Sequence, residues 1–152
     1  MKNKIAVVSD KRFLESYNLS NCLTQYKGLT IAKCIESNSP TIATIQKAKG
    51  EEFTYAFVCQ WLFNLNDILA LKNPMNDTQI KLCSQYILDE FYGLKIADLT
   101  LVSKRILSGL YGEFYERISI TKIMTIIREY DDERKDWSAN QSIRQHYENK
   151  KQ

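Results

Sequence analysis

The sequence predicts an all-α fold, a compact single-domain bundle of about five to six helices, with or without a short extended N-terminal segment. Apolar residues recur at helical spacing over most of the chain, and cap residues and glycines mark the breaks between the helices. A length of 152 residues, 44% of them hydrophobic, suits one core and is short for two domains. We divide the chain into an arm or short helix (1–38), a helical core (39–134) and a polar helical extension or flexible tail (135–152).

The composition excludes several classes of protein. A formal net charge of +3 is too small to direct the whole chain to nucleic acid or a membrane. The four cysteines lack the close spacing of a zinc or redox motif, which predicts reduced thiols. No apolar run is long enough for a signal peptide or a membrane span. We therefore expect a cytoplasmic protein without metal, cofactor or membrane.

The N-terminal third carries the weakest helical pattern. Apolar residues have loosely helical spacing over residues 13–26, and Gly28 ends this segment before a short extended piece at residues 29–35. Residues 5–8 suit either a short strand or an arm that docks on the rest. Ser39 as N-cap and Pro40 in the first helical position then predict a helix over residues 40–49, which Gly50 ends in a left-handed conformation.

The next segment, from Glu51 to Leu69, predicts the central core helix. Its inward stripe consists of Phe53, Phe57, Trp61, Leu65, Ile68 and Leu69, broadened by Val58, Leu62 and Phe63. Trp61 and its aromatic neighbours would suit a stacking platform for bases or a cofactor pocket, but the helical spacing favours a helix core.

Three later helix starts have clear cap signals. Asn76 with Gln79 forms a capping box for a helix that ends near Phe91. If Lys95 is the next cap, Asp98 lies third in its helix, where a carboxylate accepts hydrogen bonds from free backbone N–H groups. A role for Asp98 as general base or metal ligand would need a nearby histidine or second carboxylate.

Ser119 caps the last core helix, which runs to Tyr130. The polar residues beyond it predict either a helical extension that lays Trp137 on the bundle, or an arm that becomes ordered on a partner. His146, in this tail, has no second ligand and suits a solvated side chain.

A glycine-marked corner precedes that last helix. Gly109 and Gly112 bracket Tyr111, and Phe114 and Tyr115 follow directly. The spacing is a weak phosphate-loop signal, and a nucleic-acid clamp of the KH type would need a sheet that the pattern does not contain. We predict a positive φ at Gly112. We also predict that Arg105 or Arg134 pairs with an acidic residue, with Asp98 as the first candidate.

A resemblance to a known family rests on several short segments. They are Gln79-Ile80, YGLKIADL at 92–99, GLYGEFYE at 109–116 and YDDER at 130–134, preceded by SPTI at 39–42 and Trp61-Leu62. Across residues 39–134 the chain resembles small uncharacterised helical proteins of bacterial prophages and mobile elements, a domain of unknown function. The resemblance implies no activity. The arrangement is distantly similar to the N-terminal domain of phage replicative-helicase loaders, which implies a replication protein as partner.

Three functions are compatible with these patterns. The first is a non-enzymatic protein–protein adaptor in mobile-element DNA replication, which binds a helicase or initiator through residues 109–117. The alternative is an accessory protein that binds nucleic acid through a basic and aromatic face, on which Tyr111 or Tyr115 would stack and which acidic residues interrupt. The predicted phosphate contacts of that face are Lys104, Arg105, Arg117, Lys122, Arg128 and Arg134. An enzyme has the least support, because no catalytic set or cofactor fingerprint is present. The candidate partner-binding residues are Lys95, Asp98, Arg105, Gly109, Tyr111, Gly112, Phe114, Tyr115, Arg117, Tyr130 and Arg134.

Overall fold

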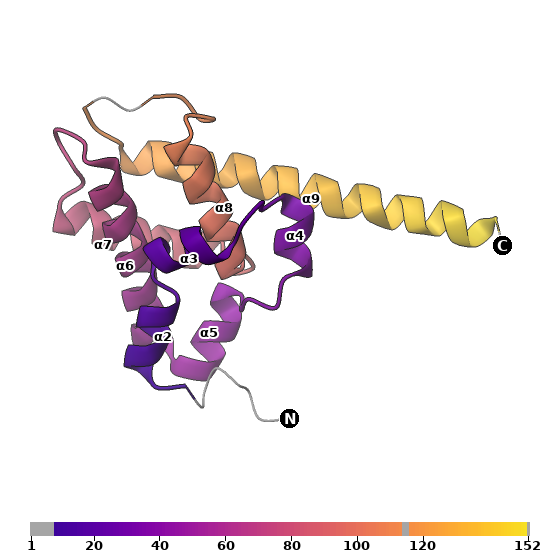
Figure 1. Ribbon diagram of the computed structural model, residues 1–152, viewed down its shortest axis with the longest axis horizontal. Coiled ribbons are helices and arrows are strands. Elements are labelled where there is room, and N and C mark those ends of the chain that lie inside the picture. The colour runs from indigo at the N-terminus through magenta and orange to yellow at the C-terminus, as the bar shows by residue number, and fades with distance from the viewer. Residues whose placement is uncertain (1–7, 114–115, 152) are drawn as a thin grey trace.

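Every regular element in the described part of the chain is an α-helix (Figure 1). The computed structural model describes residues 8–113 and 116–151. Its helices are α2 (Asp10–Ser16), α3 (Leu19–Gln25), α4 (Ile31–Glu36), α5 (Ile42–Lys49), α6 (Glu51–Leu69), α7 (Asp77–Glu90), α8 (Ile96–Leu107) and α9 (Ile120–Lys150). The predicted all-α class is confirmed. The eight helices in the described residues exceed the five to six that we expected.

The extra helices lie in the N-terminal third. Three short helices form there because Ser9, Asn18 and Thr30 each cap one of them, accepting a hydrogen bond from the backbone N–H three residues later. The extended piece predicted at residues 29–35 is wrong, since Thr30 starts α4 instead. Ile31 and Cys34, one helical turn apart, are both buried by that helix. The prediction for residues 5–8 falls almost entirely outside the described residues.

Helix α5 begins two residues later than predicted. Its N-cap is Thr41, because the preceding backbone pairs with the loop before α8. Pro40 accepts a hydrogen bond from the Ile96 N–H, and the Ile42 N–H donates to the Leu94 carbonyl. The Ser39 hydroxyl accepts from the Ala97 N–H, so the predicted cap of α5 serves α8 instead. This isolated bridge, between Thr41 and Lys95, ties α5 to α8.

Helix α6 is the central helix, as predicted. Trp61 is buried and donates its indole N–H to the Ser103 hydroxyl at 3.0 Å, so the core interpretation is confirmed. Two residues of the predicted stripe face solvent instead. Phe63 is exposed, because it lies opposite the packed face of α6, and Ile68 is exposed in the last turn of the helix.

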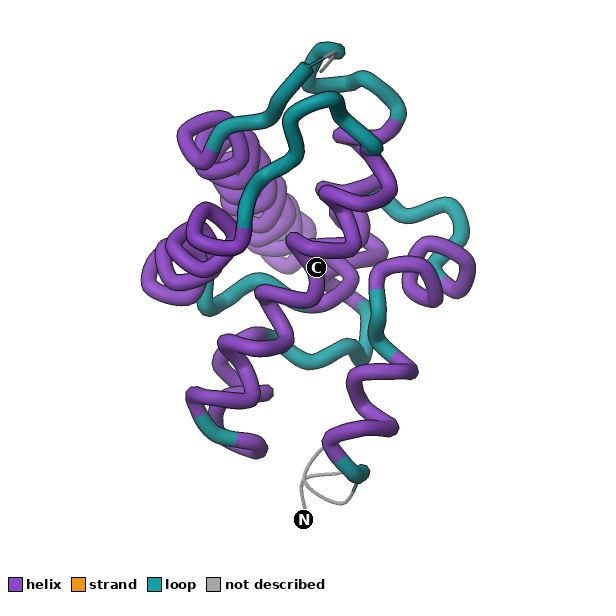
Figure 2. The backbone as a smooth tube through the Cα atoms, turned by 90° about the vertical axis from the view of Figure 1, so that its left-hand side faces the viewer, coloured by secondary structure: helices purple, strands orange, loops and turns teal. Residues whose placement is uncertain are grey.

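The last helix is longer than the core requires. Ser119 caps α9 as predicted, and the helix then continues without a break to Lys150. Trp137 packs partly buried against the core, which is the arrangement that the helical extension describes. Beyond that point α9 projects away from the bundle as one continuous helix (Figure 1), and the view of Figure 2 looks nearly along its axis. No helix in the described part is both long and apolar enough to cross a membrane.

Candidate functional site

Six of the sequence-predicted residues meet in one polar cluster between α8 and α9. Its centre is Asp98, which lies third in α8 and is fully buried. The carboxylate accepts three hydrogen bonds: from the Lys95 backbone N–H at 2.8 Å, from the Tyr130 hydroxyl at 2.5 Å and from the Arg134 Nε at 3.0 Å. The predicted pairing of Asp98 with Arg134 is confirmed. We call the residues Lys95, Asp98, Arg105, Tyr111, Tyr130, Glu133 and Arg134 the Asp98 cluster.

Tyr130 acts as a permanent donor in this cluster. Burial raises the pKa of its hydroxyl, and the nearby charge and hydrogen bond of Asp98 raise it further. The hydroxyl therefore keeps its proton and donates it to Asp98. This contact joins residues 32 positions apart and fixes the rotation of α9 against α8.

A second ion pair extends the Asp98 cluster toward the glycine corner. The Arg105 guanidinium contacts the Glu133 carboxylate at 2.6 Å and donates to the Tyr111 hydroxyl at 3.3 Å. It also lies over the ring of Tyr130, 5.3 Å from the ring centre, within the range of a cation–π contact. The corner is thereby attached to the packed face of α9.

Lys95 connects the Asp98 cluster to α4. Its ammonium donates to the carbonyls of Ile35 at 2.6 Å and Ser37 at 2.7 Å, where α4 ends. These carbonyls have no partner inside their helix, and a cation there is favoured by the helix dipole. Lys95 is therefore held by the backbone and is not directed to solvent.

The corner itself turns as the glycines predict. Gly109 has φ 84° and Gly112 has φ 98°, so the positive φ predicted at Gly112 is confirmed. Tyr111 between them is half-buried, while Arg117 is exposed and, among the described residues, forms no hydrogen bond or ion pair with the Asp98 cluster. Phe114 and Tyr115, also predicted as site residues, lie outside the described residues.

The carboxylate of Asp98 is hydrogen-bonded to groups of the protein itself and is not accessible to a bound molecule. All three donors to Asp98 come from the protein, and among the described residues no buried side-chain N or O atom lacks a hydrogen-bond partner. A general base must be able to accept a proton from a bound molecule, and Asp98 is not accessible to one. The geometry suits a clamp that holds α9, α4 and the corner together.

Sequence reasoning missed Glu133 as a partner for Arg105. A signal was available, because Tyr130, Glu133, Arg134 and Trp137 share one face of a helix at positions i, i+3, i+4 and i+7. The two carbonyl groups that bind Lys95 have no signal in the sequence, since any residue provides a carbonyl.

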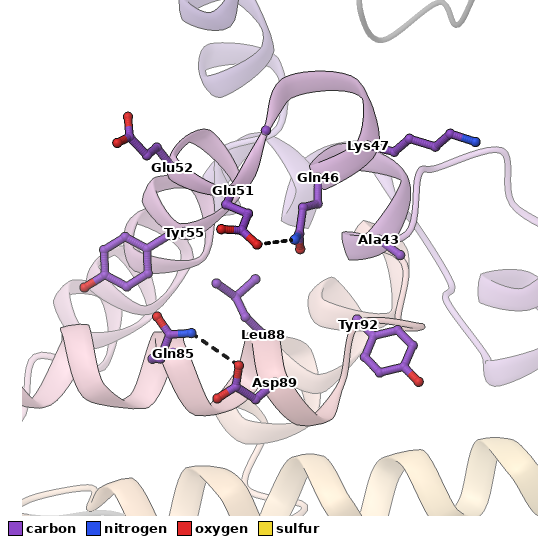
Figure 3. A pocket seen from close by; sticks show the side chains of 11 residues that line it. Ala43, Gln46, Lys47, Glu51, Glu52, Tyr55, Gln85, Leu88, Asp89 and Tyr92 are labelled. Atoms are coloured by element: carbon purple, nitrogen blue, oxygen red, sulfur yellow. Dashed lines mark hydrogen bonds between the residues drawn. The ribbon is translucent and has the colours of Figure 1, made fainter.

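Sequence reasoning also missed an open cleft of about 890 Å³ between α5, α6 and α7. Figure 3 shows Leu88 of α7 pointing toward Glu51 across the cleft and Asp89 turned toward Gln85 on the same helix, with Tyr55 and Tyr92 at the two ends of the cleft. Glu51 accepts a hydrogen bond from Gln46 and Asp89 accepts one from Gln85, each at 3.2 Å. Within residues 8–113 and 116–151, neither carboxylate nor Glu52 forms a salt bridge. We call this region the acidic cleft.

Comparison with models of protein families, with curated proteins and with solved structures finds no match. The described residues also contain no group of three or more His, Cys, Asp or Glu side chains that could hold a metal ion. The resemblance to prophage proteins and the replication role stay predictions.

Proposed function

We propose that this protein is a non-enzymatic adaptor, which binds a replication protein of a mobile element or prophage through the glycine corner. The binding surface consists of Leu107, Leu110, Gly112 and Arg117, and we call it the corner surface. Its partner would be a helicase or initiator. The replication role rests on the sequence resemblance, while the choice of surface rests on the contacts below.

One observation carries the choice of surface: Leu110 is 63% exposed on a corner that is anchored from both sides. On one side Tyr111 is bonded to Arg105 of the Asp98 cluster. On the other side the Leu110 N–H donates to the Arg105 carbonyl at 2.9 Å, which attaches this residue to the end of α8. An apolar side chain presented on a fixed backbone loses little conformational entropy on binding, which favours a protein–protein contact.

The positions of the cations favour a protein partner over nucleic acid. Four of the six predicted phosphate contacts have protein partners: Lys104 bonds to the Tyr26 carbonyl, Arg105 to Glu133, Arg128 to Glu90 and Arg134 to Asp98. Arg117 and Lys122 have no side-chain partner among the described residues. Two cations give a weak phosphate-binding surface, because affinity for nucleic acid grows with the number of phosphates neutralised.

The test is an affinity capture from host lysate with three tagged proteins, with and without nuclease. They are the wild type, a Leu110→Asp variant and a Leu82→Asp control, which changes another exposed leucine, on α7. The proposal expects a replication protein that resists nuclease, is lost with Leu110→Asp and is retained with Leu82→Asp. We choose Leu110 over Tyr111 because Tyr111 also supports the fold.

The captured protein is then purified and titrated against the three proteins. Equal affinity for Leu110→Asp and the wild type would remove the corner surface from the proposal. Capture that disappears with nuclease would replace the adaptor by the nucleic-acid alternative.

A further inference from the structure

The projecting end of α9 combines cations with an unpartnered apolar face. Ile143 and Tyr147, one turn apart, are 54% and 63% exposed. Lys150 follows on the same face, since positions i, i+4 and i+7 of a helix align, and Arg144 and Lys151 lie at its edges. We call this the tail face.

The tail lacks the packing that usually stabilises a helix of this length. Every residue from 142 to 151 is exposed, and the segment is mainly polar. Isolated helices shorter than about 12–15 residues are only marginally stable in water. Contact with a partner would therefore stabilise both the helix and its apolar face.

The acidic cleft has the complementary chemistry. It offers an apolar side chain, Leu88, between two tyrosines, of which Tyr92 is 60% exposed. Around these lie the carboxylates of Glu51 and Asp89, while Glu52 and the cation of the lining, Lys47, both extend away from the cleft (Figure 3). The cations of the tail and the carboxylates of the cleft carry opposite charges, so the two surfaces attract one another in such a contact.

The two surfaces cannot meet within one chain. Helix α9 is continuous from Ile120 to Lys150 and its end points away from the bundle (Figure 1). Reaching its own cleft would require a break in that helix. Two copies can meet without any such change.

We propose that the tail face of one copy binds in the acidic cleft of a second copy. Ile143 and Tyr147 pack against Leu88 and Tyr92, and Lys150 and Arg144 face the carboxylates of the cleft. The contact is head-to-tail, so an assembly of any length keeps one free tail at one end and one free cleft at the other, and growth is open-ended. This assembly does not involve the corner surface and is independent of the proposed adaptor function.

The contact is expected to be weak and sensitive to salt. Two helical turns in a cleft bury less than the roughly 1,200 Å² of a stable interface, so association should develop between about 10 µM and 1 mM. Raising the salt concentration to about 0.5 M should weaken it, because the charges lie near the surface.

The test uses sedimentation velocity on the full chain and three variants. A tail variant carries Ile143→Glu and Tyr147→Glu, and a cleft variant carries Asp89→Lys and Tyr92→Ala. The matched control carries Gln145→Glu and Asn149→Glu, which add the same two charges at the same spacing on the opposite face of α9. Circular dichroism establishes that each variant keeps the helical content of the wild type.

The decisive sample is a mixture of the tail variant and the cleft variant. Each is expected to be monomeric alone, while the control associates like the wild type. The tail variant keeps an intact cleft and the cleft variant an intact tail, so the mixture should form a 1:1 dimer and no larger species. A wild type that stays monomeric to 1 mM, or a mixture that does not dimerise, would overturn the proposal.

Discussion

Carboxylates play opposite parts in the Asp98 cluster and in the acidic cleft. Asp98 is fully buried and accepts hydrogen bonds from a backbone N–H, a tyrosine and an arginine. Glu51 and Asp89 are exposed, and within the described part of the chain each accepts a hydrogen bond only from a glutamine. A carboxylate whose partners all belong to its own chain stabilises the fold, whereas one that lacks a cation can receive one from another molecule. The presence of acidic residues therefore does not distinguish a site that stabilises the fold from one that can bind another molecule, whereas burial and hydrogen-bond partners do.

The largest expected effect separates the two sites by stability. Asp98→Ala should lower the free energy of unfolding by about 3–5 kcal/mol, because it leaves Arg134 and the buried Tyr130 hydroxyl without their acceptor. Asp89→Ala, at an exposed position, should change it by no more than about 0.5 kcal/mol. Urea denaturation followed by circular dichroism measures both values. Similar losses in the two variants would contradict the distinction.

The next effect concerns the tyrosines of the same two sites. Tyr130→Phe removes one donor from the buried Asp98 and should cost about 1–3 kcal/mol of unfolding free energy. Tyr92→Phe removes a hydroxyl from a mostly exposed ring, with an expected change within about 0.5 kcal/mol. The urea concentrations at which the two variants are half unfolded, compared with that of the wild type, measure both changes. A neutral Tyr130→Phe would mean that the hydroxyl does not support the cluster.

The sequence predicts those features of the fold that depend on residues close together in the chain. The capping box of Asn76 and Gln79, the cap at Ser119 and the place of Asp98 in the first turn of α8 all depend on residues within one turn. The pairing of Asp98 with Arg134 was also predictable, since a buried carboxylate needs a donor and few candidates existed.

Most features that the sequence did not predict depend on contacts between residues far apart in the chain. Ser39 and Pro40 form a locally good helix start, but their polar atoms bond to α8, 56 or more positions away, and α5 begins later. The acidic cleft brings together side chains of three helices, and no periodicity in one segment reveals such a site. The helical spacing over residues 13–26 does not reveal the break between α2 and α3, and the pattern predicts an extended piece where α4 forms, because the apolar pattern of each short helix extends over no more than two turns.

A smaller effect tests how the corner is held. Gly112→Ala should lower the free energy of unfolding by about 1 kcal/mol or more, because alanine is strained at φ 98° although no atom lies within 4 Å of the added carbon. Gly93→Ala is the control, since it has equal space and no positive φ. Equal effects of the two changes would show that backbone strain is not the cause.

The smallest effect depends on pH. Burial, and then the charge of Asp98, raise the pKa of the Cys34 thiol from 9.0 to about 11. Below pH 9 the thiol is neutral in both states, and its contribution to stability is constant. From pH 9 to 11 the unfolded thiol ionises while the folded one does not, so the free energy of unfolding falls as pH rises. In urea denaturation, Cys34→Ala should show a shallower alkaline fall, and an unchanged slope would exclude this thiol.

Amide hydrogen exchange of the wild type at about 10 µM and about 1 mM tests most directly whether one carboxylate site is closed and the other receptive. The expected result is a rise in protection with concentration at residues 142–150 and at the cleft residues of α5, α6 and α7. Protection of α8 and of the first half of α9, around Asp98, should be high and equal at both concentrations. A concentration-dependent change around Asp98, or none at the tail and cleft, would contradict the contrast between the two sites.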